Sequence, residues 1–335
     1  MTTAVPGVAR GLSSDDERAS AVRIVFMGTP QFAVPSLERL AMTKHAIVGV
    51  VTQPDRPSGR GQRVRTSAVK DVAHRLGVPT ILQPDRAKSP EFAEGMRELK
   101  PDLAIVVAFG QILPSTVIAI PPLGCINAHA SMLPHLRGAA PIQRAILAGD
   151  RETGVTVMRI NERMDAGDIL SAAGVTIAPD DDTESLGAKL SSLAADLLVD
   201  AVEAIAAGKA LWTPQDENAA SYAPMVRREE TEIDWSLSAA EIERRIRAFR
   251  PDPGAFTRHD GMRLKILGAT VAPGEPSRSP GSIENGSAET VIVACGSGSL
   301  IPSIVQPEGG RPMSATEYFR GRGAGRARVF AKAVS

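Results

Sequence analysis

The stretch IVFMGTPQFAVPSLERLA, from Ile24 to Ala41, decides how the first half of the chain folds. It begins with four apolar residues, which is typical of a buried strand. Gly28, Thr29 and Pro30 interrupt this run, and from Phe32 to Ala41 the apolar residues recur at helical spacing. A buried strand that leads directly into a helix is one half of a βαβ unit, the building block of a parallel sheet.

The same alternation continues along the next 180 or so residues. Further strands are predicted at Ile47–Thr52, Thr80–Leu82, Leu103–Val107, Ile126–His129 and Val155–Ile160, and further helices at Ala68–Leu76, Pro90–Leu99 and Ile142–Ala148. A long helix is predicted from Glu184 to Ala207, with Thr183 as its N-cap and Gly208 at its C-terminal end. We therefore expect a doubly wound, Rossmann-like α/β domain with a parallel sheet, whose ligand lies beyond the carboxyl ends of the strands.

After Gly208 the pattern changes. Leu211–Thr231 mixes Pro, Asn, Ser and charged residues without a period, which indicates a connection between domains. Ser238 and Glu241 form a capping box that opens a helix, and short strands separated by turns such as Asp260-Gly261 then predict a small, OB-like β-barrel. The expected division is a disordered extension at 1–22, a catalytic domain at 23–208, a linker at 209–231 and the barrel domain at 232–335.

Composition excludes several classes of protein. The 335 residues include 38 Lys and Arg and 38 Asp and Glu, so any binding of nucleic acid has to come from local patches rather than from net charge. The two cysteines, Cys125 and Cys295, have no ligand spacing around them, which argues against a disulfide framework and against a metal site. No apolar run is long enough for a membrane span, so we expect a cytoplasmic protein.

The candidate chemistry lies in GCINAHASMLPHLRGAAP, from Gly124 to Pro141. Strand alternation puts Asn127 and His129 on one face, where an amide and an imidazole can polarise a carbonyl and move a proton. Taken alone, such a pair is more often a structural cap. A later loop carries Asp165 and Asp168, and a carboxylate there could reach across to His129; the alternative is that both aspartates only form turns and caps.

A series of motifs along most of the chain, in this order, resembles the methionyl-tRNA formyltransferases within the wider family of enzymes that use 10-formyltetrahydrofolate. The motifs are FMGTPQFA, TQPDRPSGRGQ, VVAFGQILP, GCINAHASMLPHLRGAAPIQRAI, TGVTVM, MDAGDIL, IDWSLSAAEIERRIRAF and PMSA. The resemblance implies transfer of a formyl group from 10-formyltetrahydrofolate, as co-substrate and without metal, to the methionine of initiator Met-tRNA. It implies that Asn127, His129 and Asp165 are the catalytic residues.

The resemblance also indicates where the folate lies. Ser131, Met132, Leu133 and Pro134 match the segment that contacts folate in the family, where the second residue is usually Leu. We expect Phe109, Gly110 and Ile112 to flank the site and offer an apolar slot for the pterin. For Phe109 and Ile112, ordinary burial in the core is the open alternative.

A basic loop is the candidate tRNA contact. Its five cations, which have no acidic residue between them, are Arg56, Arg60, Arg63, Arg65 and Lys70. We expect this mobile, Gly/Pro/Ser-containing loop to lie at the carboxyl end of the second strand and to contact an acceptor stem through its phosphates. The alternative is a solvated charged face. The resemblance implies that Arg60 is the prominent arginine of this loop and that the C-terminal barrel also contacts tRNA.

Two other functions stay open at this point. A formyltransferase that acts on a different amine, such as a glycinamide ribonucleotide or an amino sugar nucleotide, could use the same three residues, although it would not need the basic loop and the barrel. A non-catalytic RNA-binding protein of the same fold is the other alternative. Met225 stands where the family often has Lys. We expect the protein to be a monomer. The sequence does not indicate the rate of the reaction, the detailed tRNA contacts of the C-terminal domain or a role for the first 21 residues.

Overall fold

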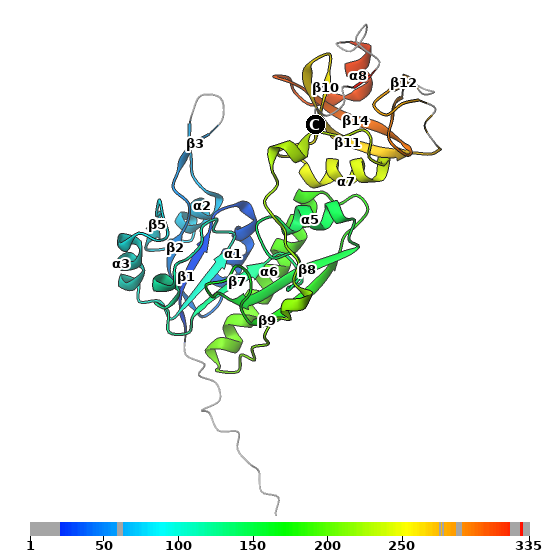
Figure 1. Cartoon of the computed structure of the whole chain (residues 1–335). Coiled ribbons are helices and arrows are strands. Elements are labelled where there is room, and N and C mark those ends of the chain that lie inside the picture. Colours follow the sequence, from blue (N-terminus) through cyan, green and yellow to red (C-terminus); the bar gives the residue numbers. More distant parts are fainter. Residues whose placement is uncertain are drawn as a thin grey trace, which may run out of the picture.

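The computed structural model describes residues 21–58, 63–274, 276, 278–285, 290–321 and 329–330. Figure 1 shows two units, an N-terminal one coloured blue to green and a smaller C-terminal one coloured yellow to red. The predicted extension therefore lies outside the described residues, apart from its last two positions. In the part of the chain that the structure describes, no helix combines the length and the apolar character that a membrane crossing needs.

A seven-stranded sheet forms the centre of the N-terminal unit. In spatial order its strands are β5 (Ile81–Leu82), β2 (Ala46–Val51), β1 (Arg23–Gly28), β6 (Leu103–Val107), β7 (Cys125–His129), β8 (Glu152–Arg159) and β9 (Ile169–Thr176). The five strands from β5 to β7 are parallel, which confirms the doubly wound pattern. The chain builds outward from β1 in one direction and then returns to add β6 beside it, so the strand order reverses between β1 and β6.

The sheet is antiparallel at one edge, where the predicted strand at Val155–Ile160 was expected to continue the parallel pattern. Strand β8, predicted at Val155–Ile160, runs antiparallel to β7, and β9 pairs antiparallel with β8. Helix α5, which precedes β8, ends at Gly149 with φ +78°, and β8 begins at Glu152, directly after this short turn. Strand β9 was not predicted because it is an edge strand whose small residues are half buried and give no clear apolar alternation.

Helices cover both faces of this sheet, and all of them except the short, unpredicted α4 match the predicted segments. They are α1 (Val34–Ala41), α2 (Ala68–Arg75), α3 (Pro90–Glu98), α4 (Ser115–Ile118), α5 (Pro141–Ala148) and α6 (Thr183–Ala206). One apolar cluster joins Phe26 of β1 to α1 and α6, and a second joins Met27 to α3. The predicted N-cap of α6 is wrong by one residue. The Asp182 side chain accepts from the backbone N–H of Glu184 and Ser185, so Thr183 is the first helical residue.

The C-terminal unit is an antiparallel sheet that curls into a half-barrel beside two helices. Its elements are α7 (Ala239–Phe249), β10 (Phe256–His259), β11 (Met262–Ala272), β12 (Ile283–Asn285), β13 (Val291–Ala294), β14 (Ser299–Pro307), β15 (Met313–Ser314) and α8 (Ala315–Arg320). The predicted capping box at Ser238 and Glu241 is confirmed. The Asp260-Gly261 turn is confirmed as well, since both residues have positive φ and join β10 to β11.

The two units are in direct contact. Helix α7 packs on α5, and Arg144 of α5 forms an ion pair of 2.6 Å with Glu230, in the short helix η3 (Arg228–Thr231). The connecting segment also contains η2 (Glu217–Ala219), and its backbone bonds to the N-terminal unit: Thr213 pairs with Ile169, and Ala223 pairs with Arg137. The segment between the domains is therefore bound to the sheet domain along much of its length.

Candidate active site

The carboxyl end of β7 carries Asn127 and His129. Asn127 lies between Val106 of β6 and Met158 of β8, and His129 is opposite Thr156 of β8. His129 is 6% exposed and Asn127 is half buried. Within the described part of the chain, the Asn127 side-chain amide has no hydrogen-bond partner, so it can donate to and accept from a bound molecule.

Both ring nitrogens of His129 face oxygen atoms. Nε2 lies 2.9 Å from the carbonyl oxygen of Leu136, and Nδ1 lies 3.7 Å from Oδ2 of Asp165. A carbonyl oxygen can only accept, so Nε2 carries a proton. The distance of 3.7 Å is too long for a hydrogen bond but short enough for an ion pair. The structure thus brings the Asp165 carboxylate to one side of the imidazole and the Leu136 carbonyl to the other.

The two residues that contact the imidazole have unusual backbone conformations. Leu136 has φ +58° and Asp165 has φ +50°, in the left-handed region that side chains other than Gly rarely adopt. The N–H of Gly138 donates to Asp165 Oδ2 over 2.8 Å, which fixes the carboxylate that faces His129. Such conformations persist only where surrounding contacts hold them, and they occur often at functional sites.

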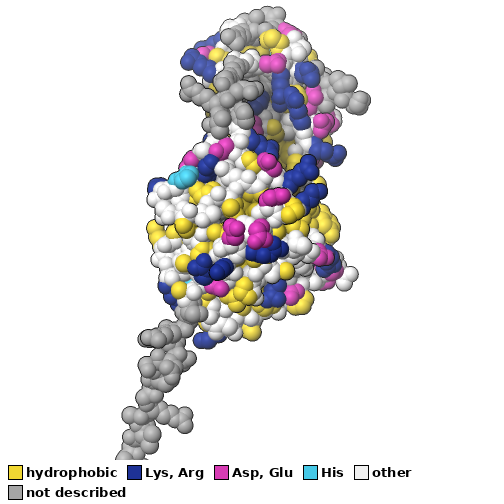
Figure 2. All heavy atoms as spheres, turned by 90° about the vertical axis from the view of Figure 1, so that its left-hand side faces the viewer, with side chains coloured by type: hydrophobic (Ala, Val, Ile, Leu, Met, Phe, Trp, Pro, Cys, Tyr) yellow, Lys and Arg dark blue, Asp and Glu magenta, His cyan; other side chains and the backbone are white. Residues whose placement is uncertain are grey.

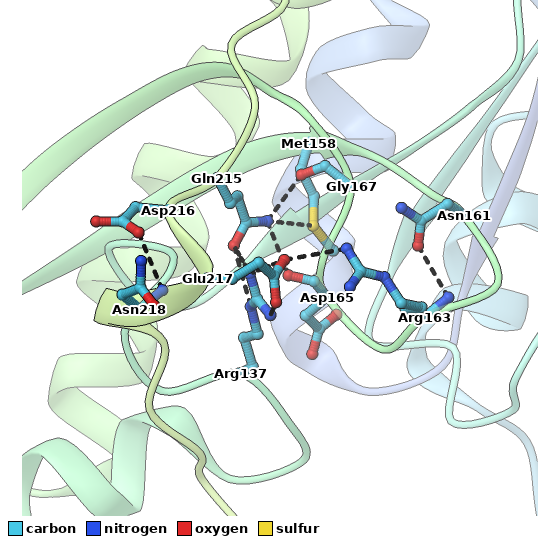
Figure 3. Close-up of polar contacts among 10 residues, drawn as sticks. All are labelled: Arg137, Met158, Asn161, Arg163, Asp165, Gly167, Gln215, Asp216, Glu217 and Asn218. Carbon is cyan, nitrogen blue, oxygen red and sulfur yellow. Dashed lines mark hydrogen bonds and ion pairs between the residues drawn. The ribbon is translucent and has the colours of Figure 1, made fainter.

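A polar network, which the sequence did not predict, holds the loop that carries Leu136 and the loop that carries Asp165. Arg137, only 2% exposed, donates from Nε and Nη2 to Gln215 Oε1 at 3.1 and 2.8 Å. It also binds the Glu217 carboxylate with both Nη atoms. Gln215 Nε2 donates to the carbonyl oxygens of Asp165 and Gly167 at 2.8 and 2.7 Å. Figure 3 shows Gln215 between Arg137 on one side and these two carbonyls on the other.

Arg137 and Glu217 form a pair of opposite charges within this network. The hydrogen bond to the Glu217 carboxylate raises the pKa of Arg137, and the Arg137 guanidinium lowers the pKa of Glu217. Arg163, beside Asp165 in the same loop, adds a second cation 3.0 Å from Glu217. No local sequence signal indicated this cluster, because Arg137 and Gln215 are 78 positions apart and Gln215 lies in an aperiodic segment.

The predicted folate segment follows His129 directly. Thr156 Oγ1 donates to the Ser131 carbonyl over 2.7 Å and accepts from the Leu133 N–H over 3.0 Å, which fixes the segment to β8. Ser131 is buried and its hydroxyl donates to the His135 carbonyl, whereas the Met132 side chain is 36% exposed. The peptide bond between Leu133 and Pro134 is cis.

The second predicted folate segment follows β6, the neighbour of β7. Phe109 is 1% exposed and packs in the core with Met27, as the alternative reading had it, and its carbonyl accepts from Thr29 Oγ1. Ile112 is 79% exposed, so ordinary core burial does not hold for it. Gly110 has φ +87° and is exposed. Two large apolar side chains are therefore exposed near the candidate site: Ile112, in the segment after β6, and Met132, in the segment after the neighbouring strand β7.

The two ends of the basic loop are short strands that pair as a β-hairpin. Strand β3 (Arg56–Ser58) pairs antiparallel with β4 (Arg63–Arg65), which places Arg56 opposite Arg65. Both of these side chains are exposed, and Arg60 lies outside the described residues. The Lys70 ammonium is engaged within the protein, because it donates to Asp55 at 2.5 Å and to Gln83 at 2.7 Å. Hydrogen bonding to Lys70 lowers the pKa of Asp55.

Other cations lie on the C-terminal unit. Figure 2 shows Lys and Arg side chains on this unit and along its boundary with the N-terminal unit, with acidic side chains among them. Three arginines near the C-terminus, Arg322, Arg326 and Arg328, lie outside the described residues. The described residues contain no group of three or more His, Cys, Asp or Glu that could hold a metal ion. Burial raises the pKa of Cys125 to about 12, which leaves its thiol unreactive.

Comparison with known proteins identifies the relatives of this chain. The family described as formyl transferase matches residues 22–202, and its C-terminal domain matches residues 225–323. Methionyl-tRNA formyltransferase of Methylococcus capsulatus is 47% identical over 298 residues, which cover 89% of this chain and 96% of that protein. The protein of the same name from Nitrosospira multiformis is 44% identical over 300 residues, with coverage of 90% and 96%.

Solved structures share the fold at low sequence identity. An N-formyltransferase from Helicobacter canadensis, in complex with folinic acid and dTDP-3-aminofucose, matches with a TM-score of 0.64 and 19% identity over 84% of this chain and 98% of its own. HypX from Aquifex aeolicus, in complex with tetrahydrofolic acid, matches with a TM-score of 0.63 and 18% identity over 91% of this chain and 48% of its own.

Proposed function

The chain belongs to the methionyl-tRNA formyltransferases, and from this premise we propose how its residues perform the reaction. The protein transfers a formyl group to the free amino group of methionine on Met-tRNA, and the formyl donor is 10-formyltetrahydrofolate. The product, N-formylmethionyl-tRNA, serves the initiation of translation, so the acceptor is initiator Met-tRNA. The observation that carries the proposed site is the contact of His129 with Leu136 and Asp165 beside the open Asn127 amide.

The reaction needs no covalent enzyme intermediate. The methionyl nitrogen attacks the formyl carbon and a C–N bond forms, while the carbonyl electron pair moves onto oxygen. This pair then returns, the bond between the formyl carbon and N10 breaks, and N10 takes up a proton as the attacking nitrogen loses one. An α-amino group titrates at about 7.7 to 8.0, so part of it is unprotonated at neutral pH. Orientation and stabilisation of the oxyanion therefore matter more than a strong base.

Asn127 and His129 supply the oxyanion stabilisation in this proposal. The Asn127 amide is unpartnered among the described residues and can donate directly. The His129 Nε2–H is bound to the Leu136 carbonyl, so it reaches the oxyanion by exchanging one oxygen acceptor for another. The Asp165 carboxylate lies 3.7 Å from Nδ1 and orients the ring from its other side.

We propose that the folate binds along the exposed apolar side chains beside these residues. Ile112 and Met132, at 79% and 36% exposure, can cover a pterin, and the flanking backbone of Gly110 and of Ser131–Pro134 can approach it closely. The Phe109 ring lies in the core with Met27, and from there it supports the backbone of the proposed folate surface at Gly110. Folate is a co-substrate here, and the proposed chemistry employs no metal.

The tRNA proposal rests on the hairpin at the carboxyl end of β2. Arg56 and Arg65 lie opposite each other and are exposed, which suits contacts with phosphates, and Arg63 begins the second strand of the same hairpin. Arg60, which lies outside the described residues, stays a predicted contact. Lys70 supports the base of the hairpin through Asp55, so we assign direct phosphate contacts to the arginines first. In Figure 1 this hairpin and the C-terminal half-barrel project from the same end of the sheet domain, which suits one tRNA that contacts both. A cytoplasmic monomer is the form we propose for the enzyme.

The test of the proposed site is formylation by His129→Ala and Asp165→Ala variants. Each loses at least about 100-fold in the single-turnover rate, as expected for removal of an acid–base group, while tRNA affinity persists. Arg97→Ala, an exposed change on α3, is the control for general effects of substitution. Wild-type turnover in either of the first two variants removes that residue from the catalytic role.

A further inference from the structure

The loop that carries Asp165 is held to the end of β8. At its far end the Arg159 N–H donates to the Asp168 carbonyl over 2.9 Å. A Cβ added to Gly167 would lie 1.7 Å from the Arg159 carbonyl oxygen, so this part of the loop lies tightly against the end of β8. Asp165 itself, at φ +50°, needs contacts that offset its backbone strain.

Gln215 supplies such contacts to the backbone of Asp165 rather than to its side chain. Its Nε2 donates to the carbonyl oxygens of Asp165 and Gly167, and its Oε1 accepts from Arg137. The orientation of the amide is determined by its partners, since carbonyls only accept and a guanidinium only donates. Arg137 is in turn held by Glu217, two residues further along the same segment.

The same segment also holds the other loop around His129. The Leu136 N–H donates to Ser221 Oγ over 2.9 Å, and Arg137 exchanges backbone hydrogen bonds with Ser221 and Ala223. Leu136 is the residue whose carbonyl binds His129 Nε2. The two loops that contact the two ring nitrogens are therefore joined to each other through Gln215 and Arg137.

We propose that Gln215 is a positioning residue for the reaction: through the Asp165 and Gly167 carbonyls it holds the Asp165 carboxylate against His129. The inference rests on the proposed function, in which Asp165 acts on His129. Without the amide, two carbonyls lose their donor and the strained backbone of Asp165 relaxes, so its carboxylate moves away from a contact that is already 3.7 Å long. Displacement of a reacting group by about 1 Å can lower a rate by as much as about 100-fold.

Two variants test this with little change in volume. Gln215→Glu replaces the donor by a carboxylate oxygen that faces two carbonyls and keeps an acceptor for Arg137. Gln215→Met removes both the donor and the acceptor without adding charge. The matched controls are Gln306→Glu and Gln306→Met, because the Gln306 amide donates to the Gly310 carbonyl at 3.0 Å in the C-terminal unit. Single-turnover formylation rates, the KM for 10-formyltetrahydrofolate and the Kd for Met-tRNA are measured for each variant, with circular dichroism and thermal unfolding beside them.

We expect both Gln215 variants to lower the single-turnover rate by about 10- to 100-fold, with KM and Kd within about twofold of wild type. A merely structural role would change binding and rate together. If Gln215→Glu does not fold, Gln215→Met decides the question alone. Wild-type rates in the folded Gln215→Met variant, or an equal loss in the Gln306 variants, would overturn the proposal.

A second readout asks whether Gln215 acts through Asp165. In an Asp165→Asn background, Gln215→Met should lower the remaining rate by no more than about twofold, because the carboxylate that it positions is already gone. A loss of the same factor in both backgrounds would show that Gln215 acts elsewhere. If wild-type protein formylated only an amino sugar nucleotide, the proposed function would fail, and the same rate ratios measured on that acceptor would still decide the role of Gln215.

Discussion

Substitution of Gly138 by Ala tests how closely the segment between the domains packs on the active-site loop. Gly138 has φ +120°, and a Cβ added there would lie 2.8 Å from the carbonyl oxygen of Ala223. That carbonyl cannot move freely, because it accepts from the Ala140 N–H over 3.1 Å while the Ala223 N–H donates to Arg137. The same glycine donates its N–H to Asp165 Oδ2. Gly138→Ala should therefore affect both stability and catalysis.

The size of the effect follows from two contributions. A backbone conformation unsuited to Ala costs about 1 to 3 kcal/mol. The forced approach to a fixed carbonyl oxygen costs about 1 to 3 kcal/mol more, as overpacking does. Gly124→Ala is the matched control, because Gly124 has φ +91° and no atom within 4 Å of its added Cβ, so only the first contribution applies. Gly138→Ala should thus be less stable than Gly124→Ala by about 1 to 3 kcal/mol.

Equilibrium denaturation in urea gives the free energy of unfolding of both variants, and single-turnover formylation gives the catalytic effect. We expect the rate of Gly138→Ala to fall by about 10-fold or more, since the anchor of the Asp165 carboxylate shifts, whereas Gly124→Ala keeps the wild-type rate. Equal stability of the two variants would refute the packing argument. A stable Gly138→Ala protein with the wild-type rate would refute the role of the Gly138 N–H in holding Asp165.

Three further predictions address folate binding, tRNA binding and the pH dependence of stability. Ile112→Asp would place a charge on the proposed pterin surface, so the KM for 10-formyltetrahydrofolate should rise by about 10-fold. An unchanged KM would exclude Ile112 from that surface. Arg56→Ala and Arg65→Ala should each reduce the slope of log K against log salt for tRNA binding by about 0.9, and an unchanged slope would exclude the phosphate contact. Hydrogen bonding to Arg144 lowers the pKa of Glu230 to about 2, below its ordinary 4.5. The pair therefore stabilises the folded protein above about pH 4.5, and this stabilisation is lost as the pH falls towards 2. The free energy of unfolding of Glu230→Gln at pH 7 should therefore be lower than that of wild type by about 1 to 3 kcal/mol, and it should fall less steeply between pH 4.5 and 2. The same acid dependence in both proteins would contradict this assignment.

The sequence predicted the elements of the fold better than their directions. Apolar runs such as Leu103–Val107 identify buried strands because every residue in them is buried. They carry no information about parallel or antiparallel pairing, which depends on how the connection returns, and this is why the reversal at β8 was missed. At the start of α6, Asp182 and Thr183 are both capping residues, and only the geometry shows that the Asp182 side chain caps the helix.

The candidate site was predictable where its residues are close in sequence. Asn127 and His129 are two positions apart in one strand, so strand alternation alone puts them together. Asp165 was expected near His129 from its loop and from the resemblance, and the structure brings the two side chains to 3.7 Å. Arg137, Gln215 and Glu217 could not be predicted, because their contacts join a loop to a segment without periodicity that is about 80 positions away. Only the folded chain reveals such a pairing.

The most direct test of the proposed mechanism is single-turnover formylation by the purified protein with 10-formyltetrahydrofolate. Initiator Met-tRNA, elongator Met-tRNA and a glycinamide ribonucleotide serve as parallel acceptors. We predict rapid formation of N-formylmethionine on initiator Met-tRNA, little on the elongator, and loss of this activity in His129→Ala. Formylation of the small amine but of neither tRNA, by folded protein that binds folate, would contradict the assignment of Met-tRNA as the substrate.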